Sequence, residues 1–283
     1  MKCFFHSADL DGKCSAAIVK YNIVKYQFPD CQLIGIDYGD KFPWEIIEKN
    51  EIIYMVDFTL QPNEQMKKLN EMCDLIWIDH HITAIKSIEE LGLAIKGIRD
   101  IKKAGCELTW EYLFPEEALP RSVKLLGRYD VWDHSDSDTL PFQYGMRLFN
   151  TDPNNQVFWE KVFNDIIYCD GILDRGRAIF DYVKRSNKEK CKVLCHEFKF
   201  EGLRFIAANA ALTGSQLFDS VYNPEKHDAM MVYYHKNGKF WTISLYSVKP
   251  EVDVSLIAKK YGGGGHKGAS GFQVDDINKI WRL

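Results

Sequence analysis

The sequence predicts an α/β protein of two domains: an N-terminal parallel sheet with helices on both faces, a linker helix, and a smaller mixed α/β domain. In the first half, short apolar runs alternate with helical segments, which is the pattern of βαβ units. In the second half the strand-like runs follow one another, and Asn237-Gly238 between two of them is a strong hairpin signal. The 283 residues are enough for two domains, which we expect at 1–190 and 191–283.

The first half carries four predicted strands, at 2–5, 33–36, 52–56 and 75–78. Helices are predicted between and after them, at 12–26, 43–49, 63–72, 109–113 and 119–129. In the first helix, apolar residues fall on or near one face, namely Ala16, Ala17, Val19 and Ile23. Residues 150–155 contain Asp, Pro and three Asn, so a loop is predicted there.

Residues 156–190 have a helical pattern throughout, with an apolar stripe formed by Ile172, Ile179, Phe180 and Val183. The charged run 184–192 follows, and we interpret the segment as a helix that connects the domains, although a charge run is more often a solvated face. Strands are then predicted at 193–200, 203–207, 229–234 and 240–246. A helix at 253–261 ends in a run of glycines.

The composition is that of an ordinary globular protein, with 46% hydrophobic and 27% charged residues. A net charge of −4 argues against a groove for long duplex DNA, which needs an excess of Lys and Arg. The eight cysteines form no CxxC pair, so we expect reduced thiols and a cytoplasmic protein; Cys191, Cys195 and His196 are more typical of buried thiols than of a zinc site. The N-terminal stretch is too acidic for a signal peptide, and no apolar run approaches the ~20 residues of a membrane span.

Hard metal ligands follow three of the predicted strands: His6-x-x-Asp9-x-Asp11, then Asp57, then Asp79-His80-His81. In an open α/β sheet, ligands bind outside the carboxyl ends of the strands, so these motifs are expected at one sheet edge. The candidate ligands are His6, Asp9, Asp11, Asp57, His80 and Asp130. Carboxylate and imidazole without thiolate suit Mn²⁺, Mg²⁺ or Fe²⁺, and two such ions would neutralise the four aspartates.

Each of these residues taken singly has a structural explanation, because an Asp after a strand is usually a turn former or a helix cap. The three motifs together favour a metal site. A carboxylate that bridges two ions ~3.5–4 Å apart would hold a hydroxide for in-line attack on phosphorus. Gly12, at a helix start, adds a weak anion site.

These motifs resemble those of the DHH superfamily of phosphoesterases. Near the other end of the chain, Gly262-Gly263-Gly264-Gly265-His266 resembles the GGGH signature of the associated C-terminal domain, DHHA1. The resemblance covers most of the chain and is to members of the oligoribonuclease, or nanoRNase, type. It implies a DHH catalytic domain at 1–190, a DHHA1 substrate-binding domain at 191–283, and an active site between them.

The resemblance also implies a role for each motif residue. His6 and Asp9 are expected to hold the first metal ion, and Asp57 to bridge the two ions. The second ion is expected to be held by Asp11, His80 and Asp130, with Asp133 as the alternative to the last of these. Asp79 is expected to orient a ligand, and His81 to face the substrate phosphate as a donor or proton carrier.

The glycine run has its own physical logic, because consecutive glycines let backbone N–H groups approach a phosphate. Gly263, Gly264, Gly265 and His266 are therefore candidate substrate-binding residues, and a flexible turn after the helix is the alternative. Tyr246 stands where family members often carry an arginine, and it could stack on a base instead. The missing charge could come from Arg128, Arg147, Lys249 or Lys267.

The predicted function is a hydrolase that cleaves phosphodiester bonds of short oligonucleotides or small nucleotides with two divalent cations, Mn²⁺ being favoured. The alternatives are a manganese pyrophosphatase, a cyclic-dinucleotide phosphodiesterase, and an inactive nucleotide-binding module. The GGGGH motif argues against the first, the lack of a sensory module against the second, and the intact ligand set against the third. The sequence does not determine the length of the substrate, the polarity of attack, or whether RNA or DNA is cleaved. It does not determine the oligomeric state either, for which a homodimer is one option.

Overall fold

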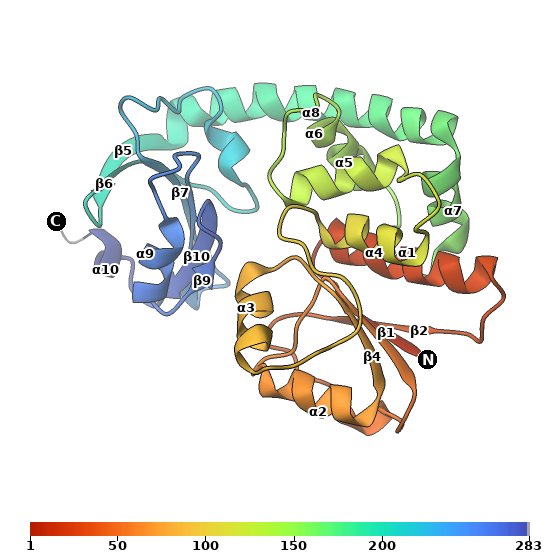
Figure 1. Cartoon of the computed structure of the whole chain (residues 1–283). Coiled ribbons are helices and arrows are strands. Elements are labelled where there is room, and N and C mark those ends of the chain that lie inside the picture. The colour runs from red at the N-terminus through yellow and green to blue at the C-terminus, as the bar shows by residue number, and fades with distance from the viewer. Residues whose placement is uncertain (282–283) are drawn as a thin grey trace. The chain divides into compact units, whose positions relative to one another are not determined.

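The computed structural model describes residues 1–281, so the last two residues of the expected second domain lie outside it. The chain divides into two compact units, Met1–Phe180 and Asp181–Leu283 (Figure 1). The division falls inside the long helix α8 (Ile166–Leu194), whereas the sequence places the boundary at residue 190. Each unit has its own sheet and its own buried core.

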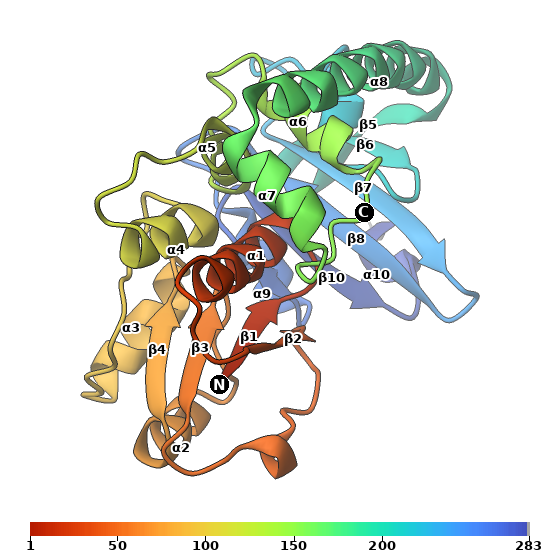
Figure 2. The ribbon, with the colours of Figure 1, turned by 90° about the vertical axis from the view of Figure 1, so that its right-hand side faces the viewer.

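The first unit is built on four parallel strands: β1 (Lys2–His6), β2 (Gln32–Ile36), β3 (Ile52–Val56) and β4 (Asp74–Ile78). The prediction of these strands is confirmed to within one residue at each end. Their order in the sheet is β2-β1-β3-β4, and Figure 2 shows them side by side. Because β2 and β3 lie on opposite sides of β1, the connection from β1 to β2 and the connection that leads on to β3 leave β1 on opposite sides. The crevice between the carboxyl ends of β1 and β3 is therefore the topological switch point, where such sheets bind ligands.

Helices cover both faces of this sheet, as predicted. On one face, α1 (Leu10–Lys25) and α4 (Gly105–Leu113) pack on apolar residues of β1, β3 and β4, including Phe5, Val56 and Ile78. On the other face, α2 (Glu64–Met72) and α3 (Ile82–Glu90) pack on Phe4, Met55 and Trp77. Figure 1 shows the sheet between these two helical layers.

The rest of the first unit is helical: the 3₁₀ turn η1 (Trp44–Ile46), α5 (Arg121–Asp130), α6 (Thr139–Met146), α7 (Gln156–Asn164) and the start of α8. The prediction of one helix over 156–190 is wrong. Asp165 has an extended backbone between α7 and α8, and its carboxylate accepts a hydrogen bond from Tyr168 N, so it begins a new helix. The predicted helix at 43–49 is only the η1 turn, and the sequence did not predict α3 or α6.

The second unit contains a six-stranded sheet in the order β5-β6-β7-β8-β10-β9. The strands are β5 (Cys195–Phe200), β6 (Leu203–Asn209), β7 (Ala229–Lys236), β8 (Phe240–Tyr246), β9 (Gly264–Gly265) and β10 (Ala269–Val274). Only β6 and β7 pair in parallel, so the sheet is mixed, as expected. Asn237 and Gly238 have φ of 52° and 70°, the positive values that a type I′ hairpin turn requires.

The helices α9 (Val254–Lys260) and α10 (Asn278–Trp281) cover one face of this sheet. The 3₁₀ turn η2 (Ser215–Phe218) and Cys191 of α8 cover the other face. The thiol of Cys191 donates to the Leu217 carbonyl, and all eight cysteines are free thiols. None of the helices in residues 1–281 combines the length and the apolar content needed to cross a bilayer.

The packing of β3 makes a first prediction. Ile53 is fully buried in the core, whereas its neighbour Ile52 is 37% exposed. We expect Ile53→Ala to lower the free energy of unfolding by about 2–5 kcal/mol, because it leaves a cavity. Ile52→Ala should cost no more than about 1 kcal/mol. Urea denaturation followed by circular dichroism measures both changes, and equal losses would contradict this placement of β3.

Candidate metal centre

A first group of ligand atoms gathers at the end of β1. Asp9 is the N-cap of α1, and its Oδ1 accepts a hydrogen bond from Gly12 N at 3.0 Å. Its other carboxylate oxygen, Oδ2, lies 3.0 Å from Nδ1 of His6, and Oδ2 of Asp57 lies 3.8 Å from the same nitrogen. Three predicted ligands from two neighbouring strands are therefore within reach of one ion.

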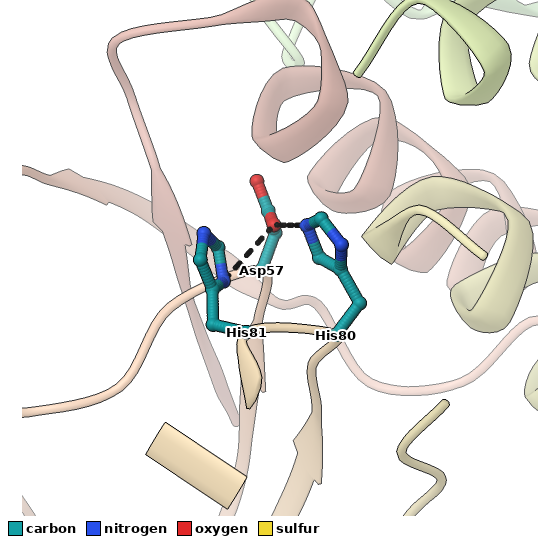
Figure 3. A group of neighbouring side chains, drawn as sticks. All are labelled: Asp57, His80 and His81. Atoms are coloured by element: carbon teal, nitrogen blue, oxygen red, sulfur yellow. Dashed lines mark ion pairs between the residues drawn. The ribbon is translucent and has the colours of Figure 1, made fainter. Parts of the chain in front are cut away.

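A second group contains Asp11, His80 and Asp130. Nε2 of His80 lies 3.2 Å from Oδ2 of Asp130 and 3.7 Å from Oδ2 of Asp11. The same nitrogen is 3.2 Å from Oδ1 of Asp57, which lies between His80 and His81 in Figure 3. Asp133, the alternative to Asp130, instead accepts a hydrogen bond from Ser135 N.

Asp57 belongs to the first group, with Oδ2 toward His6, and its Oδ1 contacts His80 of the second group. Asp57 also forms a third possible ligand group with His80 and His81. Its backbone has a φ of 52°, in the left-handed region that non-glycine residues seldom adopt, and its N–H donates to the Ile78 carbonyl. This turn directs the side chain to the crevice between β1 and β3. Asp57 therefore has the geometry that a bridging ligand needs.

The donor atoms fit divalent cations. Nδ1 of His6, Oδ1 of Asp57 and Nε2 of His80 are buried without a hydrogen-bond partner, which is costly for polar atoms. The ligand atoms of His6 and Asp9 lie 3.0 Å apart and those of His80 and Asp57 3.2 Å apart. These separations match the ~3 Å between adjacent ligands of an octahedral ion with ~2.1 Å bonds. Burial and the carboxylates of Asp11 and Asp9 raise the pKa of Asp57 well above its ordinary value, and bound cations would offset this repulsion.

Asp79 anchors the loop that carries the two histidines. Its Oδ1 accepts hydrogen bonds from the backbone N–H groups of His80 and His81 and, at 2.7 Å, from Nδ1 of His81. Its Oδ2 accepts from Thr59 Oγ1 and Trp77 Nε1. Burial alone would raise the pKa of Asp79, but the bonds from His81 and Thr59 lower it to about 2, so the carboxylate is ionised. Asp79 is not a member of any ligand group, but it fixes the orientation of the His81 ring. The sequence analysis did not predict that Thr59 supports Asp79.

The N-terminus of α4 holds Asp11. The backbone N–H groups of Gly105 and Cys106 each donate to one Asp11 oxygen at 2.7 Å, as the free amides of a helix start can. A Cβ on Gly105 would lie 2.7 Å from Cβ of Asp57 and 3.1 Å from Oδ2 of Asp11, so only glycine fits. Sequence reasoning missed these two residues, because they lie 94 and 95 positions from their partner.

Asp37 is a further residue that the sequence analysis missed. It directly follows β2, the one strand end at which no ligand was predicted, and its Oδ1 lies 3.2 Å from Nε2 of His6. Because a carboxylate only accepts, the contact with Asp37 requires a proton on Nε2. With a cation bound between His6, Asp9 and Asp57, the lone pair of Nδ1 would be directed at that cation, and Asp37 would hold the tautomer that such a ligand needs.

The predicted substrate-binding residues of the second unit lie on neighbouring strands. Gly264 and Gly265 form β9, which pairs with β10, and Tyr246 of β8 lies opposite Ala269 of β10. His266 N donates to the Ala269 carbonyl at 2.7 Å and closes the turn between β9 and β10. Two of the residues proposed to replace the family arginine are already in ion pairs, Arg128 with Asp133 and Asp136, and Lys249 with Asp228.

No protein-family model matches the chain. It is 27% identical over 272 residues to an uncharacterized protein of Acanthamoeba polyphaga mimivirus, a match that covers 89% of this chain and 58% of that protein. It is 24% identical over 249 residues to oligoribonuclease NrnB of Bacillus subtilis, covering 81% of this chain and 60% of NrnB. The chain therefore spans less than two thirds of the length of these two curated relatives.

Solved structures resemble the chain over nearly its whole length. The DHH domain of a member of a family of ribosomal proteins has a TM-score of 0.57 and 15% identity, covering 98% of this chain and 83% of that one. The pGpG-specific phosphodiesterase PggH of Vibrio cholerae has a TM-score of 0.55 and 11% identity, covering 98% and 94%. RecJ of Thermus thermophilus, in complex with Mn²⁺, has a TM-score of 0.50 and 14% identity, covering 99% and 50%. The chain has the fold of DHH-domain proteins, so the fold that the resemblance implies is confirmed.

The tight fit at Gly105 makes a second prediction. Gly105→Ala should displace Asp57 or Asp11, and we expect Mn²⁺ affinity to fall about 10- to 100-fold, as when groups that support metal ligands are lost. Equilibrium dialysis with elemental analysis measures the bound metal. Gly171→Ala in α8 is the control, because a Cβ there meets no atom within 4 Å. Wild-type metal binding by the Gly105 variant would show that this close contact does not shape the site.

Proposed function

We propose that the chain is a metal-dependent phosphoesterase that hydrolyses phosphodiester bonds of short oligonucleotides or small nucleotides. The observation that carries this proposal is the set of ligand groups at the switch point of the sheet, where Asp57 of the first group contacts His80 of the second. Burying carboxylates and imidazoles side by side is costly, so their arrangement is best explained by the cations that they would hold.

The proposed ligands are His6 and Asp9 for one ion, Asp11, His80 and Asp130 for the other, and Asp57 for both. Bound there, two divalent cations would activate a water molecule and offset charge on the phosphoryl group. We favour Mn²⁺, with Mg²⁺ and Fe²⁺ as alternatives, and the manganese complex of RecJ supports this choice. His81, oriented by Asp79 through Nδ1, is proposed to donate a hydrogen bond or a proton to the substrate phosphate.

Short substrates are supported by two similar proteins. NrnB is named an oligoribonuclease, and PggH is named a phosphodiesterase specific for the dinucleotide pGpG. The net charge of −4 also disfavours long duplex DNA. We therefore propose that the substrate has only a few nucleotides.

We further propose that the loop 262–266 and Tyr246 in the second unit bind substrate. Three of its four glycines are required by the backbone: Gly262 and Gly265 have φ of 76° and 131°, and a Cβ on Gly263 would lie 2.1 Å from the Gly271 carbonyl oxygen. Gly264 has neither constraint, since a Cβ there meets no atom within 4 Å. A bare backbone at Gly264 is thus left for the approach of a ligand such as a phosphate.

A substrate panel tests the proposed function. Purified protein with Mn²⁺ is given a dinucleotide, a five-residue RNA, a long single-stranded DNA, a cyclic dinucleotide, adenosine 3′,5′-bisphosphate and pyrophosphate. We expect rapid release of mononucleotides from the dinucleotide and the short RNA, loss of activity with a chelator, and its return with Mn²⁺. Asp57→Ala should be inactive and bind less metal, because both groups lose a ligand.

Preference for pyrophosphate or for the cyclic dinucleotide would overturn the substrate assignment and leave the metal centre in place. If the Mn²⁺-loaded protein hydrolyses none of the six substrates, a nucleotide-binding module would be favoured. Turnover that resists the chelator would refute the metal-dependent mechanism.

The loop of the second unit gives a separate prediction. We expect His266→Ala to lower kcat/KM for the dinucleotide about tenfold or more, since a hydrogen bond to a charged group contributes about 1.5–3 kcal/mol. Gly264→Ala should also lower kcat/KM, because its methyl group would keep a phosphate away from the backbone N–H. Metal content and the urea midpoint should stay as in the wild type. If the kinetics are unchanged, the loop serves only to join α9 to β10.

A further inference from the structure

We propose that a pocket beside the metal centre, formed by the segment after β2 and the segment after β3, binds the base of the nucleotide next to the scissile phosphate. This inference rests on the proposed function and adds a base-binding subsite to it. The pocket lies entirely within the first unit, and its lining includes Asp37, Tyr38, Phe42, Trp44, Phe58 and Gln61.

The pocket begins at the ligand shell of the metal centre. Asp37 lines it and also contacts Nε2 of His6 at 3.2 Å. The ring of Tyr38 lies 5.6 Å from the His6 ring, centroid to centroid. A nucleotide whose phosphate reaches the metal centre therefore has its nearest base within reach of Tyr38.

The shape of the pocket suits one base. Its volume of about 300 Å³ is at the small end of the ~300–1,000 Å³ typical of ligand sites, which fits a single ring system. Tyr38 is 47% exposed, and Phe58 supports its ring at 4.8 Å between centroids. An aromatic ring that is packed on one side and open to solvent on the other is the usual platform for stacking a base.

The polar groups of the pocket suit the polar edge of a base. The side-chain amide nitrogens of Gln61 and Gln65 donate to Asn63 Oδ1 and to the backbone carbonyl of Gln61. Each of these side chains still has one N–H donor and its Oε1 acceptor, which together match a base edge that carries an acceptor and an amino group. The carboxylate of Asp40 meanwhile accepts from Asp37 N and fixes the turn that carries Tyr38.

The kinetic test compares pApA with two analogues, each of which lacks one base. We expect Tyr38→Ala to lower kcat/KM for pApA by about 5- to 150-fold, the range that loss of one stacked base supports. The loss should disappear for the analogue that lacks the base bound in the pocket, and Tyr38→Phe should keep most of the activity because the ring remains. Tyr26→Ala is the matched control, since Tyr26 is 49% exposed and lies at the far end of α1.

Two results of this test overturn the subsite. Equal losses on pApA and both analogues would show that Tyr38 acts through the metal centre. Unchanged kinetics would show that no base enters the pocket.

A binding experiment separates the subsite from the proposed function. Titration of the Mn²⁺-loaded protein with adenosine monophosphate should show binding that Tyr38→Ala weakens and Tyr26→Ala does not. If the wild type binds this nucleotide through Tyr38 but cleaves no phosphodiester, the subsite stands and the proposed function fails. If the wild type cleaves pApA but Tyr38→Ala does not change the affinity for adenosine monophosphate, the proposed function stands and the subsite is wrong.

Discussion

The constraint on which the first unit depends is the burial of like charges at one edge of its sheet. Burial and the neighbouring carboxylates of Asp11 and Asp9 raise the pKa of both Asp57 and Asp130 well above ordinary values. Without counter-charges this cluster opposes folding, because desolvated carboxylates repel one another. Bound cations would supply one part of the compensation, and the surrounding backbone supplies the other.

The backbone compensation comes from helix starts and turns. Asp9 receives the N–H of Gly12 at the start of α1, and Asp11 receives two N–H groups from the start of α4. Asp79 receives two from the loop of its own motif. Each bond favours the ionised carboxylate and also fixes its direction. Asp11 of the centre therefore also joins α1 to α4.

Much of this could be predicted from the sequence, because strand ends are visible as the last polar residues of apolar runs, and parallel strands bring them together. The contacts of Gly105 and Asp37 could not be predicted, since they depend on which helix and which strand lie next to the ligands. The same holds for β10, a glycine-containing strand of low propensity that forms because β8 offers it a partner. The break at Asp165 was missed because the helical pattern on its two sides is continuous, and one hydrogen bond to Tyr168 N decides it.

The order of the strands explains how the roles are divided at the edge. β1 and β3 flank the switch point, so their ends supply His6 and Asp57, which face each other across it. β4 lies beyond β3 and supplies the histidines on the second side of Asp57. β2 lies beyond β1, where no ligand is needed, and its end instead places Asp37 behind His6 and Tyr38 beside it. In the proposed function, the end of this edge strand thus has two roles, because Asp37 supports a metal ligand while Tyr38 stacks on a base of the substrate.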